Sequence, residues 1–472
     1  MNERDRLTVS SLSLSTDQVG LAAAETPGAF SWLRMRLDYS PSMQLSRHAV
    51  VRRVVLPGMA VAFSLALAVR LAAVHQLSVA RQRFEAEVAP LPQLVKPTAG
   101  GGREPAFIER LGGPAGLPDG ADLARIRQLY FRSPSTWSPA ELDSCRRFLA
   151  VNTALVAAAD RVAVRRGSTL VGARGESSWW DPAQAGRLLV RAGAQTSLLK
   201  LRIRLALLDR SSTEVRQGME ALAAEVEALE AHPGVVFQLI GLGQEKGLLQ
   251  AMAWVAEEPG AAPEDLVTAR RLLPSWSFAD GVRRLIAGEA SYLLAADELP
   301  LADADRAHLL DGYRRLSLTL AQDLGAVHQA ALRGSQAIGR PTSLPAIILA
   351  LNRPAFEGAR DQIAATLAAR QIARLALDLR LAADRGCTYP ATLDAQPLAQ
   401  EPDPFTAHRP HYVRNAQGGA LLSNPSAAAA WEAMPRCLKT KPPPYVWRLP
   451  APCAPGKRQA PASAGSAANA NG

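Results

Sequence analysis

Two segments of this chain contain residues whose types and spacing suit catalysis or phosphate binding. Ser197 and Lys200 have the Ser-x-x-Lys spacing in which a lysine activates a serine nucleophile, but no Lys-Thr-Gly or Ser-Asp-Asn segment follows. Gly241 to Gly247 is glycine-rich, as phosphate loops are, yet Lys246 is not followed by Ser or Thr. We therefore expect both segments to belong to packed helices, where small residues allow close helix contacts.

Glu176 is the sharpest candidate for an acid–base residue. It begins the segment Glu-Ser-Ser-Trp-Trp-Asp-Pro, which resembles the Glu-Ser segment of lytic transglycosylases, helical enzymes that cleave peptidoglycan. The resemblance implies that Glu176 is the acid–base in a cleft that raises its pKa, with Trp179 or Trp180 stacking on sugar rings. Of the Gly-Ala-x-Gly-Leu-x-Gln stretch of that family only Gly193-Ala194-Gln195 is present. The other interpretation is a loop whose tryptophans pack on the next helix, which Asp181 caps.

The sequence contains no motif that predicts a metal ion or an organic cofactor. Its seven histidines form no His-Glu-x-x-His pair, and no Gly-x-Ser-x-Gly nucleophile elbow occurs. The net charge of +10 comes without a DNA- or RNA-binding motif, so we expect anionic lipid, an anionic cell-wall polymer or an envelope protein as partner, and no nucleic acid. We expect a non-enzymatic interaction or scaffold role, with peptidoglycan cleavage by Glu176 as the alternative.

Residues 54–74 form an apolar segment that we expect to cross a membrane as one helix. Polar side chains occur only at Ser64 and Arg70, and the length matches a hydrocarbon core of about 30 Å. Pro57 lies in the first turn, where it removes few hydrogen bonds, and Arg70 lies close enough to the far end to reach the headgroups. The alternatives are a buried core helix and a secretory signal cleaved near Ala66-Leu67-Ala68.

Arginines gather on the N-terminal side of this segment. Five of the 20 residues before Val54 are arginines, against two of the 20 residues after Val74. The positive-inside rule then predicts that residues 1–53, a partly disordered tail rich in Ser, Thr and Ala, lie in the cytoplasm. We therefore expect a bacterial inner-membrane protein that contacts the lipid bilayer through residues 54–74 and places the rest of the chain in the periplasm.

The four cysteines are Cys145, Cys387, Cys437 and Cys453, and no two form a Cys-x-x-Cys pair of the kind that binds zinc. A periplasmic domain lies in an oxidising compartment, which permits disulfides. The pairing that we expect first is Cys387 with Cys437, which would bracket the C-terminal part of the chain. The alternative is that all four are reduced or buried thiols.

The middle of the chain favours helices, because Ala, Leu and Arg dominate and aromatic residues make up only 5%. Residues 75–105 are expected to continue the membrane helix and end in a Pro/Gly linker, and residues 106–386 to form an α-helical domain. Capping boxes are expected at Ser138–Glu141 and Ser211–Glu214. The helices are predicted near 139–164, 182–209, 212–231, 234–257, 263–273, 277–296, 303–331 and 354–385.

The composition changes to proline-rich after the last of these helices. Two strand-like segments, 411–414 and 420–423, flank the turn at 415–419, which predicts a β-hairpin. We assign 387–434 to a small module with this hairpin and 435–472 to a basic, Pro-rich, disordered tail. The predicted fold class is therefore mainly α: a single transmembrane helix, an outward-facing α-helical domain and a small C-terminal module with one β-hairpin.

The order of motifs in this module suggests a relationship. A long helix, Tyr389-Pro390, Asp403-Pro404-Phe405 and a hairpin ending at Ser423 follow one another over about residues 368–424. This order resembles the tail of type II secretion pseudopilins and of many uncharacterised single-span bacterial membrane proteins. Pseudopilins often hold calcium through acidic residues after that serine, but 424–430 has no carboxylate, so we expect no calcium. The pseudopilin leader is also absent, so the resemblance favours the uncharacterised membrane proteins over fibre subunits.

Overall fold

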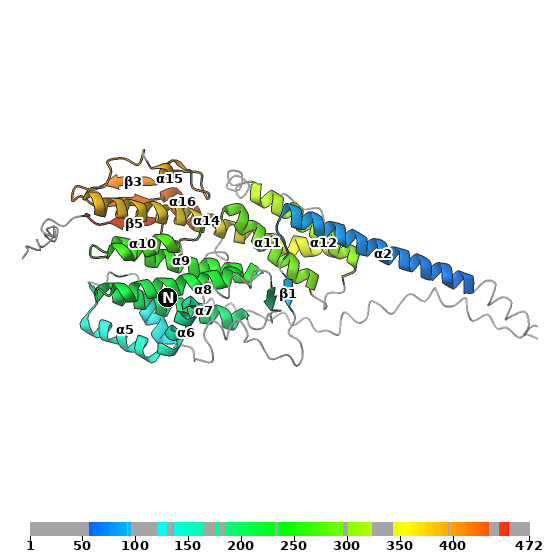
Figure 1. Ribbon diagram of the computed structural model, residues 1–472, viewed down its shortest axis with the longest axis horizontal. Helices are drawn as coiled ribbons and strands as arrows, with labels where there is room; N and C mark the ends of the chain where they lie inside the picture. Colours follow the sequence, from blue (N-terminus) through cyan, green and yellow to red (C-terminus); the bar gives the residue numbers. More distant parts are fainter. Residues whose placement is uncertain are drawn as a thin grey trace, which may run out of the picture. The chain divides into compact units, whose positions relative to one another are not determined.

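The described part of the chain is mostly α-helical, as the sequence predicts (Figure 1). The computed structural model describes residues 56–91, 93–95, 120–129, 132, 136–164, 176–178, 185–231, 235–295, 301–322, 343–394, 396–433 and 443–452. Its contacts define two compact units, 1–70 and 71–472. The elements in chain order are α2 (Leu56–Glu87), β1 (Gln93–Val95), α4 (Gly120–Leu129), α5 (Pro139–Val151), α6 (Thr153–Val164), β2 (Glu176–Ser178), α7 (Ala185–Leu208), α8 (Ser212–Ala231), α9 (Val235–Glu257), α10 (Pro263–Leu272), α11 (Phe278–Ala295), α12 (Asp303–Gln322), α14 (Leu344–Gly386), α15 (Pro397–Gln400), β3 (His411–Arg414), β4 (Ala420–Ser423), α16 (Pro425–Ala433) and β5 (Val446–Leu449).

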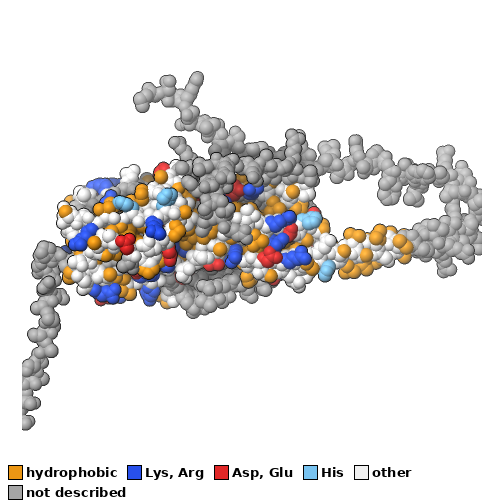
Figure 2. Space-filling model, turned by 90° about the horizontal axis from the view of Figure 1, so that it is seen from above, with side chains coloured by type: hydrophobic (Ala, Val, Ile, Leu, Met, Phe, Trp, Pro, Cys, Tyr) orange, Lys and Arg blue, Asp and Glu red, His pale blue; other side chains and the backbone are white. Residues whose placement is uncertain are grey.

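The N-terminal part of α2 is apolar and exposed all round. Met59, Val61 and Phe63 expose 64%, 68% and 72% of their surface. The helix is long and apolar enough to cross a membrane, and none of its most apolar stretch is buried. Figure 2 shows the described part of this segment almost free of charged side chains. The expected apolar helix is therefore present, and the alternative of a buried core helix is wrong.

The C-terminal part of α2 belongs to the larger unit and packs on its core. Leu77 and Ala80 are partly buried against the core, and Phe84 is fully buried. These residues are three and four positions apart, so they lie on one face of the helix. At the end of α2, the Glu87 carboxylate accepts a hydrogen bond of 2.6 Å from Arg314 on α12. The helix thus continues beyond the apolar segment, as the sequence predicts, and its packing on the core of the larger unit is an addition to that prediction.

The capping box predicted at the start of α5 is present. Ser138 Oγ accepts a hydrogen bond from the Glu141 N–H at 3.2 Å, and Glu141 Oε2 accepts one from the Ser138 N–H at 2.7 Å. The single helix expected over 139–164 is divided at Asn152, whose side-chain amide donates to the Phe148 carbonyl at 2.8 Å. The side chain of Asn152 competes there for backbone groups, so α5 and α6 are separate helices.

The start of α8 differs from the predicted capping box. Arg210 adopts a left-handed conformation with φ of 55°, and the Ser211 N–H donates to the Ala206 carbonyl at 2.8 Å. This hydrogen bond is typical of a helix C-terminus. The Ser211 N–H, which the predicted capping box would pair with Glu214, therefore closes the end of α7. Glu214 accepts a hydrogen bond of 2.6 Å from Arg202 Nε, which joins α8 to α7.

α9 is the central helix of the domain and contacts α7, α8 and α14. Of its 23 residues, 17 are buried. The small residues at this contact matter, because a Cβ added at Gly247 would lie 2.7 Å from Cγ2 of Thr196 on α7. The glycine-rich segment 241–247 is therefore a packed helix surface, as expected, and not a phosphate loop.

α14 begins ten residues before the helix predicted at 354–385. Ser343 caps it and Pro345 occupies the first turn, while Pro354 lies inside the helix. Contacts hold the helix on both sides of this proline: the Asn352 side-chain amide donates to the Tyr313 hydroxyl at 3.1 Å, and Phe356 is 1% exposed. Tertiary packing thus outweighs the helix-breaking tendency of the proline.

The C-terminal module contains the predicted hairpin and one further strand. β3 and β4 pair antiparallel, and β5 pairs with the other edge of β4. The prediction of a disordered tail over 435–472 is wrong for β5. Trp447 and Leu449 are 0% and 2% exposed, and the Tyr445 hydroxyl donates to the Ala365 carbonyl of α14 at 3.2 Å. Exposed and buried residues alternate along β5, and the prolines before the strand concealed it in the sequence.

The motif residues of the module have structural partners. The buried Asp403 carboxylate accepts hydrogen bonds of 2.8 Å from the N–H groups of Phe405 and Thr406. The Tyr389 hydroxyl donates to the Pro450 carbonyl at 3.0 Å, which connects the end of α14 to the end of β5. The Asp-Pro-Phe segment therefore forms a turn that its own aspartate stabilises, and Tyr389 holds the end of β5 at the end of α14.

Candidate functional site

The segment around the predicted acid Glu176 is only partly described. Its backbone forms β2, which pairs in parallel with β1 and places Glu176 opposite Gln93. β2 replaces the loop expected from the sequence. Its partner β1 lies in the predicted linker at 75–105. Trp179 and Trp180, the predicted sugar-stacking residues, lie outside the described residues, so the catalytic interpretation of Glu176 stays a prediction.

Ser197 and Lys200 are held by different neighbours. Ser197 Oγ donates to the Gly193 carbonyl at 2.7 Å and accepts a hydrogen bond of 3.0 Å from Arg127 Nε. The Lys200 ammonium donates to the side-chain carbonyl of Gln250 on α9. Both side chains are buried within the helical packing. Their contacts link α7 to α4 and α9, and both residues lie within a helix, as expected from the sequence.

The cysteines divide into two kinds. Cys387 is disulfide-bonded, whereas Cys145 is a buried free thiol. Burial, with a smaller effect of the Glu141 charge, raises the pKa of Cys145 to about 11, so this thiol is protonated and unreactive at neutral pH. Cys437 lies outside the described residues, so its pairing with Cys387 stays a prediction. The alternative of four reduced thiols is wrong for Cys387.

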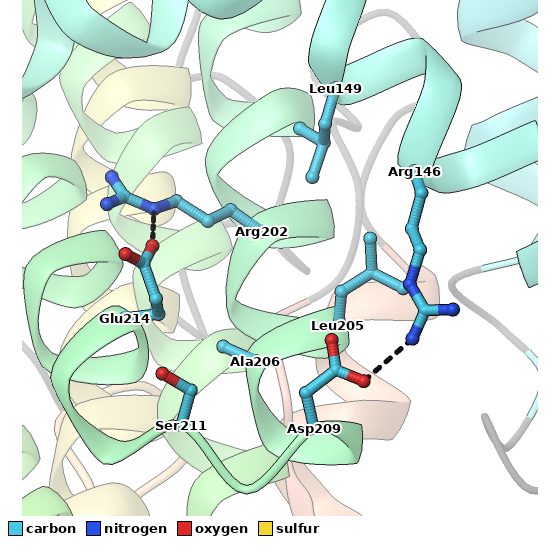
Figure 3. A pocket seen from close by; sticks show the side chains of 8 residues that line it. All are labelled: Arg146, Leu149, Arg202, Leu205, Ala206, Asp209, Ser211 and Glu214. Atoms are coloured by element: carbon cyan, nitrogen blue, oxygen red, sulfur yellow. Dashed lines mark hydrogen bonds and ion pairs between the residues drawn. The ribbon is translucent and has the colours of Figure 1, made fainter. Parts of the chain in front are cut away.

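A cavity of about 310 Å³ opens where α5, α7 and α8 meet (Figure 3). Its apolar wall comes from Leu149, Leu205 and Ala206, and two ion pairs form the rim. The lining residues are Arg146, Leu149, Arg202, Leu205, Ala206, Asp209, Ser211 and Glu214.

The charges at this cavity compensate one another. Arg146 pairs with Asp209 at 2.7 Å and Arg202 with Glu214 at 2.6 Å. Arg202 also pairs with Asp160 at 2.7 Å, so its guanidinium is shared between two carboxylates. Burial lowers the pKa of Arg202, but the hydrogen bond that Arg202 donates to Glu214 and the Asp160 charge outweigh this effect, and the net pKa is raised. The cavity therefore suits an uncharged group flanked by polar atoms better than a free anion.

A second group of charged residues is buried between α8, α9, α11 and α14, and we call it the Trp276 cluster. Arg370 on α14 binds Glu245 on α9 through two hydrogen bonds, one of which joins Nη2 to Oε2 at 2.7 Å. Its guanidinium lies 3.8 Å from the centre of the Trp276 ring. The Trp276 indole donates to Glu230 Oε2 at 3.0 Å. The cluster consists of Glu230, Glu245, Trp276, Arg284 and Arg370.

Burial changes the protonation of this cluster. It raises the pKa of Glu230 to about 7, with a further contribution from the nearby Glu245 charge, while Arg370 and Arg284 act in the opposite direction. Arg284 lies 4.9 Å from the Trp276 ring centre, on which the Arg370 guanidinium also packs. The cluster therefore joins four helices, and Glu230 is its titratable member near neutral pH.

Lys246 forms a neighbouring buried contact. Its ammonium donates to the side-chain carbonyl of Gln362 on α14 and lies 4.2 Å from the Trp431 ring centre on α16. Burial lowers the pKa of Lys246 to about 7. This lysine thus connects α9 to α14 and to the C-terminal module. These contacts belong to a packed helix and do not support a phosphate loop in the glycine-rich segment 241–247.

Comparison with known proteins adds no further assignment. In the described residues, no group of three or more His, Cys, Asp or Glu side chains is arranged to hold a metal ion. No model of a protein family, no curated protein and no solved structure matches the chain.

Proposed function

We propose that this chain is a single-pass inner-membrane protein whose helical domain serves as a non-enzymatic interaction scaffold in the periplasm. The observation that carries the proposal is the apolar part of α2, where Phe63 and Val61 expose 72% and 68% of their surface. Such a surface is unfavourable in water, at roughly 25 cal/mol for each Å² of apolar area, and it is stable in hydrocarbon.

Two independent features support this orientation. Arginines are concentrated before the apolar segment, which favours a cytoplasmic N-terminus. Cys387 in the C-terminal module is disulfide-bonded, and structural disulfides are rare in the reducing cytoplasm. Both features support a periplasmic position for the helical domain and the C-terminal module.

A scaffold role is supported by the partners of the described charged groups, which lie within the protein. Glu245 and Arg370 bind each other, and Lys246 binds Gln362, so these buried groups fix helices in place. The arginines at the cavity rim are paired with carboxylates. The net charge of +10 favours an acidic envelope protein or an anionic cell-wall polymer as the partner. The resemblance of the C-terminal module to pseudopilin tails is part of this proposal, as a further contact surface.

Reporter fusions test this proposal. A reporter that is active only in the periplasm, fused after residue 110, should be active, and a reporter that is active only in the cytoplasm should be inactive there. The opposite pair of results would overturn the orientation. Purified full-length protein should also leave isolated peptidoglycan intact; cleavage that is lost in Glu176→Gln would instead establish the enzyme alternative.

A further inference from the structure

We propose that the outer edge of β3 binds an extended acidic segment of a partner protein, which adds a further strand to the C-terminal sheet. This inference rests on the proposed scaffold function and deepens it, because it names the surface and the kind of partner. The sheet has the strand order β3-β4-β5, so β3 and β5 form its two edges. An edge accepts another strand only where its outward backbone groups are unpaired.

The backbone groups on the outer side of β3 belong to Tyr412 and Arg414. Successive residue pairs of two antiparallel strands alternate between exchanging hydrogen bonds and pointing their N–H and C=O groups outward. The Asn415 N–H donates to the Gly419 carbonyl at 2.9 Å, and the next pair along the strands is Arg414 with Ala420. The N–H and C=O groups of Arg414, and those of Tyr412 two residues before it, therefore point away from β4.

The same reasoning applied to β5 agrees with an observed contact. The Asn424 N–H donates to the Tyr445 carbonyl at 2.9 Å, and the register from this pair points the Arg448 N–H away from β4. That N–H donates to Glu257 Oε1 at the end of α9, at 3.0 Å. β5 also contacts α14. This edge of the sheet is therefore already occupied within the protein.

The outer edge of β3 has no such cover in the described part of the chain. None of the hydrogen bonds among the described residues involves the outward N–H and C=O groups of Tyr412 and Arg414. β4 is the one described element with which β3 makes an extended contact. Val413, between the two outward residues, is 43% exposed. Figure 1 shows β3 on the side of the module away from α9 and α10, with β5 nearer to them.

The charges around β3 favour an acidic partner. Arg409, His411 and Arg414 are exposed. Asp403 is the one carboxylate between residues 402 and 431, and it is buried and bound to backbone N–H groups. Two copies of β3 would bring their basic residues together, and like charges on an edge strand oppose such pairing. A strand with carboxylates on alternate residues would meet opposite charges.

Peptide binding to the full-length protein in a non-ionic detergent tests the inference. The probe is the capped peptide Glu-Thr-Glu-Val-Glu-Thr, which has carboxylates on alternate residues. The matched peptide has the same sequence and charge, with N-methyl groups on its two central residues, so that neither of its edges can pair with a strand. Calorimetry would measure affinity, and hydrogen exchange resolved by residue would report on the amides of β3.

We expect the unmodified peptide to bind and to slow exchange of the Tyr412 and Arg414 amides by roughly tenfold or more. The Val413 amide, which already pairs with β4, should not change. The N-methylated peptide should bind roughly tenfold more weakly, because it cannot form the main-chain hydrogen bonds. Arg409→Glu should weaken binding of the unmodified peptide, whereas Arg147→Glu, which changes a side chain on α5 that is 73% exposed, should leave it at the wild-type level.

Equal binding of the two peptides, or binding that leaves the Tyr412 and Arg414 amides unprotected, would overturn the inference and leave electrostatic attraction alone. Absence of peptide binding would also overturn it, because main-chain pairing depends little on the sequence of the added strand. Dextran sulfate has no N–H groups; if it protected these amides as well as the peptide does, the edge would be assigned to an anionic polymer and the inference would be wrong. Reporter fusions that contradict the periplasmic orientation would overturn the proposed function, but they would not alter peptide binding by the purified protein.

Discussion

α2 and α9 are both long apolar helices, but their charged residues differ. In the apolar part of α2, Arg70 is the one charged side chain of the described residues, and it lies near the end of the predicted span. α9 contains Glu245 and Lys246 in its middle, at 0% and 5% exposure. These residues bind Arg370 and Gln362 of α14, respectively.

The difference is the one expected between a helix that is apolar enough to cross a membrane and a helix of a protein core. A protein interior can supply a partner for each buried charge, whereas hydrocarbon supplies none, so charge is excluded from the middle of the span. α9 is stable with charges because α14 presents matched groups at the correct positions. The comparison can therefore be tested by removing a partner from α9 and by adding a charge to α2.

Removing Arg370 should have the largest effect. Arg370→Ala leaves Glu245 buried without its ion-pair partner, and breaking a buried pair costs about 3 to 5 kcal/mol. Urea unfolding of the full-length protein in detergent would measure the loss. The matched control is Arg271→Ala, because Arg271 exposes 66% of its side chain in its pair with Glu220 and should contribute about 1 kcal/mol at most. Equal effects of both variants would contradict the structural role of the Trp276 cluster.

A charge in the middle of α2 should impair membrane insertion. Phe63→Arg places a guanidinium near the centre of the predicted span, where the apparent insertion free energy of arginine is about 3 kcal/mol less favourable than that of phenylalanine. The inserted fraction in a translocation assay should fall, while Phe63→Leu should remain at the wild-type level. An unchanged inserted fraction for Phe63→Arg would show that this segment does not depend on lipid.

Glu230 should make stability depend on pH. Its folded-state pKa is raised from 4.5 to about 7, so its contribution to stability is fully present below pH 4.5 and is lost as the pH rises to about 7, because the unfolded chain ionises first. Glu230→Gln removes this titration. Unfolding free energies between pH 5 and pH 7.5 should fall less in the variant, with a difference of about 2 to 3 kcal/mol. A variant profile parallel to the wild type would contradict this assignment.

The smallest effect is expected at the cavity rim. Arg146 and Asp209 expose 55% and 49% of their side chains, so their pair resembles an ordinary surface ion pair. Arg146→Ala should lower the unfolding free energy by about 0 to 1 kcal/mol, and less in high salt. A loss of several kcal/mol would show that this exposed ion pair stabilises the fold as much as a buried one. It would contradict the expected difference from the Trp276 cluster.

Features determined by neighbouring residues were predictable from the sequence. The apolar helix through Phe63, the capping box at Ser138 and the hairpin at 411–423 each depend on short segments whose pattern identifies them. The absence of a phosphate loop at 241–247 followed from the missing Ser or Thr after Lys246.

Features determined by distant residues were not predictable. The Trp276 cluster brings Glu230 and Arg370 together from helices 140 positions apart in the sequence, and only their charges inside apolar helix faces signal it. β5 forms by pairing with β4, which is distant in the sequence. The prolines and basic residues near β5 indicated disorder when the segment was considered alone. The last long helix was predicted over 354–385, whereas α14 begins at Leu344 and packing around Phe356 carries it through Pro354.

The most direct test of the account is the accessibility of the helical domain from outside the inner membrane. Val151→Cys places a thiol at a side chain that is 82% exposed, and Ser13→Cys places one in the N-terminal tail. In intact spheroplasts, a membrane-impermeant maleimide should label Val151→Cys fully and should label Ser13→Cys only after lysis. Labelling of Val151→Cys that requires lysis would contradict a single-pass protein with a periplasmic helical domain.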